Sequence, residues 1–238
     1  GMTNADVSLI EYDVADDEIL KDDDGFCKQI LTHDPGLLIV RIGVNAVFNG
    51  YTDAQATEKK ILRDVFEEGD AWFNTGDLIK TVDVGYALGK THYQFVDRVG
   101  DTFRWKSENV STNEVGEILN GFSDVNMSNV YGVQIPGCEG RAGMAAFSLE
   151  DASSFDWQAF SDYVDNSLPK YARPLFIRII QEMDTTGTFK LKKNDLRNEA
   201  FDINKVSDQI YCLKPNSSNY EVLDNEWLQT INSEQAGY

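Results

Sequence analysis

A twenty-residue stretch, VDRVGDTFRWKSENVSTNEV (residues 96–115), separates two parts of the chain that differ in character. Before it, alternating apolar and polar residues between turn signals predict mostly strands. After it, capped amphipathic helices alternate with apolar strands, a pattern typical of an α+β domain. Gly100 lies within the stretch, and the φ angle of a glycine is almost unrestricted. We therefore expect an α+β protein made of a β-rich part and a small α+β domain, with a boundary near residues 97–101.

The first part is expected to form strands and one helix. The strands are the segments VSLIEYDV, LLIVRIGV, AWFNTGDL and HYQFVD. A helix is predicted between the second and third of these, where an apolar stripe ends at Gly69 and consists of Ile61, Leu62, Val65 and Phe66. FNTGD (residues 73–77) is expected at a strand end, where its Thr-Gly-Asp sequence turns the backbone tightly.

Helix start signals organise the second part. Ser111 and Glu114 have the spacing of a capping box, and the helix that follows presents an apolar face made by Val115, Ile118 and Leu119. Gly116 inside this helix costs about 1 kcal/mol relative to alanine. Further helices are predicted over residues 156–167 and in LKKNDLRNEAF, and strands in VYGVQI, AGMAAFSL and PLFIRII. The glycine-rich segment GCEGRAG (residues 137–143) is expected to be a turn between two strands.

The charge balance excludes several classes of partner. The chain has 40 acidic and 21 basic residues, and its formal net charge is −19. Binding to nucleic acid or to anionic lipid needs a basic face, so we expect no nucleic-acid partner, although a local basic pocket for a small anion is compatible with this charge. Two histidines and three widely spaced cysteines predict no metal site and reduced thiols. No apolar run is long enough for a transmembrane segment, and we expect a cytoplasmic protein.

Two short motifs contain side chains that suit a nucleotide. Asp77 ends FNTGD, and a carboxylate placed there can accept two hydrogen bonds from a ribose diol. Arg98 lies in DRVGD, where it offers a planar fork of donors close to Gly100. Taken alone, FNTGD is better explained as an ordinary turn and DRVGD as a surface ion pair, so neither motif decides the function.

A third motif, TTGTFKLKK (residues 185–193), places Lys190 at the end of a small, flexible loop before a predicted helix. The ammonium group of a mobile lysine is a compact charge that can be brought to a phosphate or carboxylate as negative charge develops there. Three lysines within four residues are also typical of a solvated helix start. This motif alone therefore leaves both interpretations open.

Taken in order, FNTGD, DRVGDTFRWKSENVSTNEV, LPKYARP (residues 168–174) and TGTFK resemble the carboxyl-terminal part of the adenylate-forming acyl-CoA synthetases. The narrower likeness is to the fatty acid transport protein and very-long-chain acyl-CoA synthetase branch, whose hinge reads roughly DR-GDTFRWKGENV. The resemblance implies that residues 1–96 are the β-rich, barrel-like end of a large adenylation domain. Residues 97–101 would be a hinge, and residues 102–238 the small carboxyl-terminal domain.

The resemblance also implies a reaction and roles for particular residues. Enzymes of this family form an acyl-adenylate and pyrophosphate from ATP and a carboxylic acid, and the CoA thiol then displaces AMP. By motif, Asp77 and Arg98 would bind the ribose of ATP or AMP, and Lys190 would be the catalytic residue that neutralises charge at the α-phosphate. The hinge would consist of Val99, Gly100 and Asp101. The loop that turns toward CoA would consist of Trp105, Lys106, Ser107, Glu108 and Asn109.

Two departures from the family pattern affect these expectations. Ser107 replaces the glycine of WKGEN, which makes thioester formation more doubtful than adenylation. The phosphate-binding loop, the Mg²⁺-binding segment and the fatty-acyl tunnel that the family carries upstream do not occur in the sequence. We therefore expect a chain that is inactive alone and needs a missing amino-terminal portion, or a homo-oligomer that covers the exposed surface. The full enzyme would be cytoplasmic or peripheral to a membrane, and a stand-alone module that binds a nucleotide, CoA or a partner is the alternative.

Overall fold

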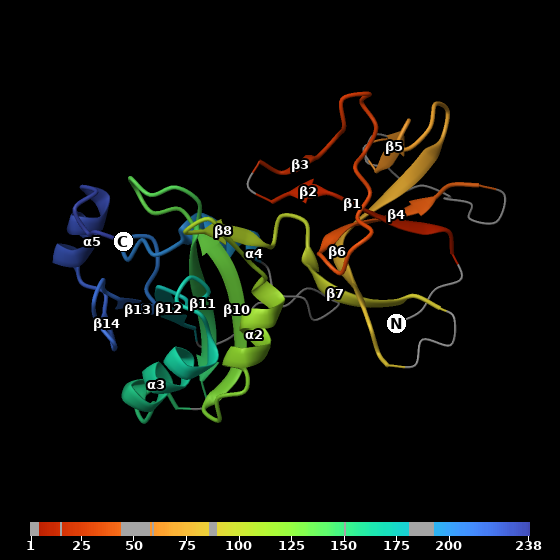
Figure 1. Ribbon diagram of the computed structural model, residues 1–238. Coiled ribbons are helices and arrows are strands. Elements are labelled where there is room, and N and C mark those ends of the chain that lie inside the picture. Colours follow the sequence, from red (N-terminus) through yellow and green to blue (C-terminus); the bar gives the residue numbers. More distant parts are fainter. Residues whose placement is uncertain are drawn as a thin grey trace. The chain divides into compact units, whose positions relative to one another are not determined.

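The computed structural model describes residues 5–14, 16–43, 58, 60–85, 90–149, 151–180 and 193–238. The chain separates into two compact units, Gly1–Gly100 and Asp101–Tyr238 (Figure 1). Each unit has a hydrophobic core of its own. The larger core belongs to the second unit, and Ile10, Leu37, Ile39 and Trp72 are among the buried residues of the smaller one.

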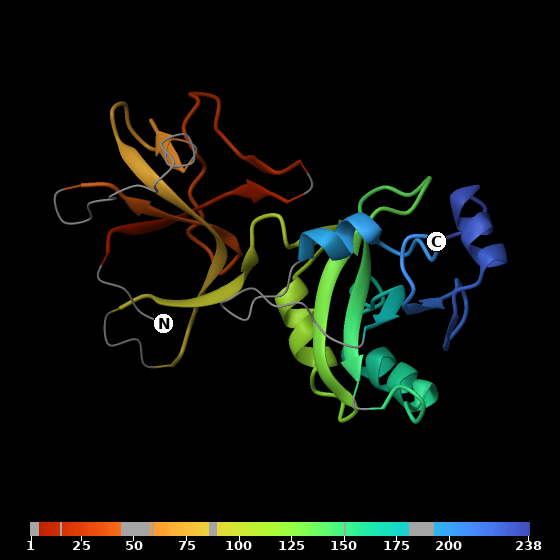
Figure 2. The ribbon, with the colours of Figure 1, turned by 180° about the vertical axis from the view of Figure 1, so that it is seen from behind.

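The first unit is built around one long strand, β6 (Ala71–Val82). The strand β4 (Gly36–Arg41) pairs along one edge of β6, and β1 (Val7–Ile10) pairs with β4. Along the other edge, β5 (Ile61–Arg63) pairs with the first half of β6 and β7 (His92–Arg98) with the second half, as Figures 1 and 2 show. All these pairings are antiparallel, and a small hairpin of β2 (Tyr12–Asp13) and β3 (Glu18–Ile19) completes the described strands.

The predicted strand end at FNTGD is wrong, because the motif lies inside β6. Register in the β4–β6 pair shifts between Leu37 and Ile39, which pair with Leu78 and Asn74, so that residues 75–77 lie opposite Leu38 alone. Gly76 has a φ of 78° there, a left-handed conformation that glycine adopts without strain. A glycine in a strand interior often marks such a bulge, and bulges redirect the side chain that follows them.

The predicted helix before Gly69 does not include its apolar stripe, although residue 58 is helical. Residues 61–63 form the strand β5, and residues 64–69 form bends and a turn. The buried carboxylate of Asp70 fixes this turn by accepting hydrogen bonds from the backbone N–H of Val65 (2.6 Å) and of Phe66 (3.1 Å). It also accepts one from the Trp72 indole (2.9 Å). A spacing of apolar residues that suits a helix is therefore overridden by a tertiary hydrogen-bond network.

The second unit contains a five-stranded sheet in the order β10–β11–β12–β13–β14. Its strands are β10 (Val125–Val133), β11 (Ala142–Leu149), β12 (Phe176–Ile179), β13 (Gln209–Leu213) and β14 (Tyr220–Val222). The β11–β12 pair is parallel and the others are antiparallel. The first three strands and the turn between β10 and β11 confirm the sequence prediction, whereas β13 and β14 were not predicted.

Helices cover both faces of this sheet. The helices α2 (Thr112–Leu119) and α3 (Trp157–Ser167) lie on one face and α4 (Lys193–Glu199) on the other, as comparison of Figures 1 and 2 shows. These three helices confirm the sequence prediction, and the Ser111 side chain caps α2 by accepting a hydrogen bond from the N–H of Glu114. A further helix, α5 (Asn225–Asn232), lies near the carboxyl terminus.

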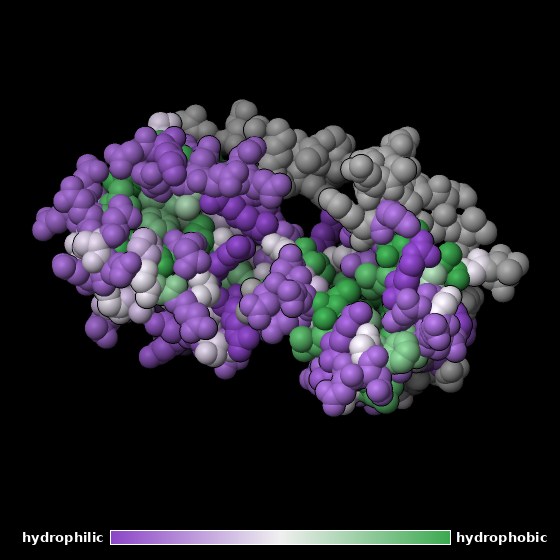
Figure 3. Space-filling view, turned by 90° about the horizontal axis from the view of Figure 1, so that it is seen from above, coloured by the Kyte–Doolittle hydropathy of each residue, from purple (hydrophilic) through white to green (hydrophobic). Residues whose placement is uncertain are grey.

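Aromatic side chains fill the space between the sheet and the first pair of helices. The ring of Phe160 on α3 lies 5.4 Å from that of Phe147 on β11 and 5.3 Å from that of Phe122, which follows α2. Such edge-to-face pairs add to the stabilisation that apolar burial provides. Hydrophilic residues cover most of the face seen in Figure 3, with apolar residues in separate patches.

Candidate functional site

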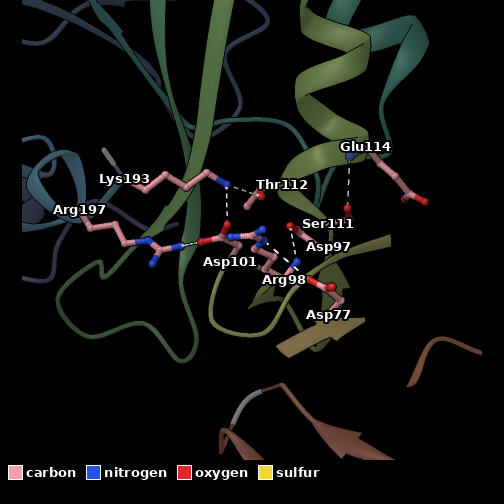
Figure 4. Close-up of polar contacts among 9 residues, drawn as sticks. All are labelled: Asp77, Asp97, Arg98, Asp101, Ser111, Thr112, Glu114, Lys193 and Arg197. Atoms are coloured by element: carbon pink, nitrogen blue, oxygen red, sulfur yellow. Dashed lines mark hydrogen bonds and ion pairs between the residues drawn. The ribbon is translucent and has the colours of Figure 1, made fainter. Parts of the chain in front are cut away.

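The bulge in β6 places Asp77 directly opposite Arg98 of β7. The two residues are cross-strand partners, and Arg98 Nε lies 3.7 Å from Asp77 Oδ1 (Figure 4). The Arg98 side chain is 53% exposed and that of Asp77 is 33% exposed. The pair is therefore solvated, and its attraction is worth under about 1 kcal/mol. Both groups can therefore exchange this weak contact for a ligand. A carboxylate acceptor beside a guanidinium donor suits a vicinal diol or a sugar phosphate.

Two neighbours stabilise the backbone beneath this pair. The buried Asp97 side chain accepts a hydrogen bond from the N–H of Arg98 at 2.9 Å. The N–H of Val99 donates to the carbonyl of Gly76, also at 2.9 Å. The turn that carries Asp77 and the end of β7 are therefore joined by backbone hydrogen bonds as well as by the ion pair.

The expected CoA-side loop is a tight hairpin formed by β8 (Phe103–Trp105) and β9 (Glu108–Val110). Its two turn residues, Lys106 and Ser107, have φ angles of 53° and 67°, which is the pattern of a type I′ turn. Residues 106–109 are exposed, but Trp105 is 3% exposed and belongs to the core of the second unit. The exposed residues of this hairpin are thus the ones available to a ligand.

The glycine-rich turn of residues 137–143 supports this hairpin. The N–H of Arg141 donates to the carbonyl of Arg104 at 2.7 Å, and Gly140 pairs with Trp105 in an isolated bridge. A Cβ at Gly140 would lie 2.3 Å from the Arg104 carbonyl oxygen, so only glycine allows the two backbones to approach this closely. The turn therefore has a structural role in positioning the hairpin.

The relatives of the chain decide its family. It is 43% identical over 228 residues to long-chain fatty acid transport protein 6 from Mus musculus, a match that covers 95% of this chain and 36% of the relative. It is also 43% identical over 213 residues to the medium/long-chain-fatty-acid–CoA ligase FadD6 from Mycobacterium tuberculosis, covering 90% of this chain and 34% of the relative. The chain belongs to the family of fatty acid transport proteins and fatty-acid–CoA ligases. It spans about a third of the length of these relatives.

Solved structures of adenylate-forming ligases share the fold of this family member. ATP-bound MatB from Rhodopseudomonas palustris matches 85% of this chain with a TM-score of 0.62 and 23% identity, over 36% of its own length. O-succinylbenzoate coenzyme A synthetase (MenE) from Bacillus subtilis, in complex with AMP, matches 83% of this chain with a TM-score of 0.57 and 21% identity, over 33% of its own length. No protein-family model matches the chain.

Of the other residues predicted from the sequence, the structure describes those of the hinge but not the catalytic lysine. Lys190 lies outside the described residues. Gly100 has a φ of 82°, and Asp101 is the first residue of the second unit. The Asp101 carboxylate contacts Lys193 and Arg197 of α4, a cluster that the sequence analysis missed. Lys193 and Arg197 are four residues apart, which places both side chains on one face of the predicted helix. This spacing was the available sequence signal for a basic helix face.

The described ranges contain neither a cluster of metal-ligating side chains nor a helix that could span a membrane. Within these ranges, no group of three or more His, Cys, Asp and Glu side chains has an arrangement that would bind a metal ion. None of the helices in the described part of the chain is long and apolar enough to cross a membrane.

Proposed function

We propose that the chain supplies the carboxyl-terminal part of an ATP-dependent fatty acid:CoA ligase that works through an acyl-adenylate. The observation that carries this proposal is the cross-strand pairing of Asp77 with Arg98. It occurs in a chain that is 43% identical to a fatty-acid–CoA ligase over 90% of its length. In this proposal the Asp77 carboxylate accepts hydrogen bonds from the ribose hydroxyls of ATP, and Arg98 donates to the same sugar.

The two other motifs take successive roles in the proposed reaction. Lys190 would neutralise the charge that develops between the fatty acid carboxylate and the α-phosphate of ATP, which preorganised donors stabilise strongly in a site shielded from water. The CoA thiol would then displace AMP, with the exposed hairpin residues 106–109 beside the path of CoA. Their exposure, and the rigid support that Gly140 gives the hairpin, favour this placement over one that involves the buried Trp105.

Substrate binding in this proposal also needs an amino-terminal portion, because the chain spans only about a third of its relatives. That portion would bind the polyphosphate, Mg²⁺ and the acyl chain. We infer that the chain alone does not form acyl-CoA. Leu31 and Phe95, which are 86% and 44% exposed, are apolar side chains of the first unit that the amino-terminal portion or a second copy of the chain would cover.

The test is reconstitution. The chain is mixed with the amino-terminal portion of a homologous ligase, ATP, Mg²⁺, palmitate and CoA, and palmitoyl-CoA is measured. We expect thioester only in the mixture. We also expect Asp77→Ala to lower the rate of palmitoyl-CoA formation at least about tenfold, which is the effect of losing one hydrogen bond to a charged group. Asp23→Ala, at an exposed aspartate of the same unit, should leave the rate unchanged.

The absence of product at every mixing ratio, with both pieces folded, would contradict the proposal. Saturable binding of AMP or CoA to the chain alone, measured by calorimetry in the absence of any thioester product, would favour the non-catalytic binding module instead.

A further inference from the structure

The two faces of the five-stranded sheet in the second unit differ in chemical character. On the face covered by α2 and α3, Ser128 of β10 donates to the Gly116 carbonyl of α2, and aromatic rings fill the space beside it. Successive residues of a strand point to opposite faces, so Asn129 and Tyr131 lie on the face covered by α4 (Figure 2). The α4 face therefore has polar side chains beneath its helix, where the other face has rings.

Asn129 and Tyr131 are buried without hydrogen-bond partners. Asn129 is 2% exposed and Tyr131 is 0% exposed. Over the described ranges, the amide nitrogen and oxygen of Asn129 and the hydroxyl of Tyr131 form no hydrogen bond. Burial raises the pKa of the Tyr131 hydroxyl above its ordinary value of about 10, so the group keeps its proton and can both donate and accept. Buried polar groups without partners destabilise a fold, and native proteins almost always pair them.

Charged side chains near these two residues do not supply the missing partners. Arg178 of β12, whose side chain is 9% exposed, forms ion pairs with Glu199 of α4 and with Asp208. All three charges act electrostatically on Tyr131. The guanidinium directs its donors to the two carboxylates, and its Nε donates to Asp208 at 2.7 Å. The surroundings of Asn129 and Tyr131 are thus polar, but the charged groups are already paired with one another.

The side chain at the centre of this region is small. Ala146 of β11 pairs with Asn129 on one side and with Arg178 on the other, so a single methyl group lies between two longer side chains. None of the seven residues of α4 is buried, whereas α2 and α3 each insert buried side chains toward the sheet. An enclosed polar region with several hydrogen-bonding groups is where globular proteins hold internal water.

We propose that the interface between β10 and α4 is a binding site for ordered water, with the Asn129 amide and the Tyr131 hydroxyl as its ligands. The water accepts hydrogen bonds from the NH₂ group of Asn129, donates to its carbonyl oxygen and bonds to the Tyr131 hydroxyl, so that each buried group gains a partner. An internal water of this kind makes about three hydrogen bonds and is part of the structure. The site lies within the second unit and does not depend on the proposed ligase function.

A tyrosine variant tests whether the hydroxyl is hydrated. Tyr131→Phe removes the hydroxyl and keeps the ring. If water binds the hydroxyl, we expect the equilibrium constant for unfolding of the second unit in urea to rise about threefold to tenfold, because one hydrogen bond is lost. If the hydroxyl is dry, its removal takes away an unpaired buried group and the constant should fall. A fall would overturn the proposal.

The matched control is Tyr220→Phe in the same unit. Tyr220 is also buried, but its hydroxyl donates directly to the Pro174 carbonyl at 2.7 Å. Its removal should raise the unfolding constant by a similar factor whether or not the α4 face is hydrated. The control therefore gives the size of the effect that a paired buried hydroxyl produces in this unit.

Nuclear Overhauser effects between water and the ¹⁵N-labelled 238-residue chain detect the water itself. We expect cross-peaks from water to the side-chain NH₂ protons of Asn129, with the sign of a long-lived contact. Asn113, which is exposed, should show only the short-lived contacts of surface water. The absence of a water cross-peak at the Asn129 amide would overturn the proposal. Neither measurement involves a nucleotide, CoA or thioester, so failure of this proposal and failure of the proposed function are separate results.

Discussion

At the residue scale, Ser107 is in a conformation that its side chain disfavours. Its φ of 67° follows one of 53° at Lys106, and type I′ turns strongly prefer glycine or asparagine at such positions. We predict that Ser107→Gly raises the free energy of unfolding of the second unit by roughly 0.5–1 kcal/mol, because glycine removes the left-handed penalty. Urea unfolding checks this prediction.

The control for Ser107 is Ser123→Gly, at an exposed serine whose φ is not positive. That change should be neutral or destabilising, since glycine there only increases the entropy of the unfolded chain. A stabilisation of equal size in both variants would show that the turn geometry is not the cause.

Protonation of Asp70 should weaken the first unit. Burial disfavours its charged form, but hydrogen bonds from the Trp72 indole and from the backbone N–H of Val65 and Phe66 outweigh this and lower the pKa of Asp70. A carboxyl whose folded-state pKa is depressed stabilises the protein above its unfolded pKa of about 3.9, and this contribution is lost as the pH falls through the folded pKa.

We predict that Asp70→Asn lowers the free energy of unfolding of the first unit by about 2 kcal/mol at pH 7. The difference from wild type should shrink as the pH falls below about 4, because Asp70 of the unfolded chain then takes up a proton, and it should vanish below the depressed folded-state pKa. Unfolding followed at several pH values measures it, with Asp23→Asn as the exposed control. A difference that stays constant between pH 7 and pH 3 would contradict this explanation.

Candidate site residues could be predicted where the reactive side chains lie in a short motif. Contacts between segments that are distant in the sequence could not be predicted. Asp77 and Arg98 stood out because Asp77 follows Gly76 and Arg98 lies two residues before Gly100, and the structure brings them together as strand partners. Asp101 and Lys193 are 92 residues apart, so no local pattern links them. The importance of Asp70 was missed for the same reason, because its partners are defined by a turn that the helix prediction had excluded.

At the element scale, α2 contains a glycine that the structure does not require. A Cβ at Gly116 would lie 3.7 Å from Ser128 Oγ and 3.8 Å from Val130 Cγ2, which are ordinary contacts. We predict that Gly116→Ala stabilises the second unit by about 1 kcal/mol, the difference in helix propensity between the two residues. Thermal unfolding of the variant checks this.

The matched control is Gly132→Ala in β10, where the new Cβ would lie 2.7 Å from Phe103 Cβ. That change should destabilise the same unit by about 1–3 kcal/mol, as overpacked core sites do. If Gly116→Ala destabilises as well, the backbone of α2 is less regular than the structure indicates.

Elements with explicit start and stop signals were predictable, whereas those that depend on pairing partners were not. The helices α2 and α3 begin after Ser111 and Asp156, whose side chains cap them, and both followed from the sequence. The strand β5 was mistaken for part of a helix, because Ile61 and Leu62 gain their stability by pairing with Phe73 and Trp72 of β6. Periodicity alone does not contain that information.

At the scale of the whole molecule, the chain contains two units with separate cores and a boundary between Gly100 and Asp101. Composition and hydrophobic pattern predicted an α+β protein, but the family followed only from several motifs occurring in order, and the relatives establish it. The charge of −19 does not reveal the reaction, because the proposed site needs only a few local cations.

The most direct test of the account separates the two half-reactions in the reconstituted enzyme with Lys190→Ala. Adenylation is measured as palmitate-dependent exchange of pyrophosphate into ATP, and thioester formation is measured from supplied palmitoyl-adenylate and CoA. We predict that adenylation falls by about 10²–10³-fold, as when a preorganised donor is removed, while thioester formation changes by less than about threefold. Lys192→Ala should change neither rate. Equal losses in both half-reactions, or no loss in adenylation, would contradict the proposed role of this chain.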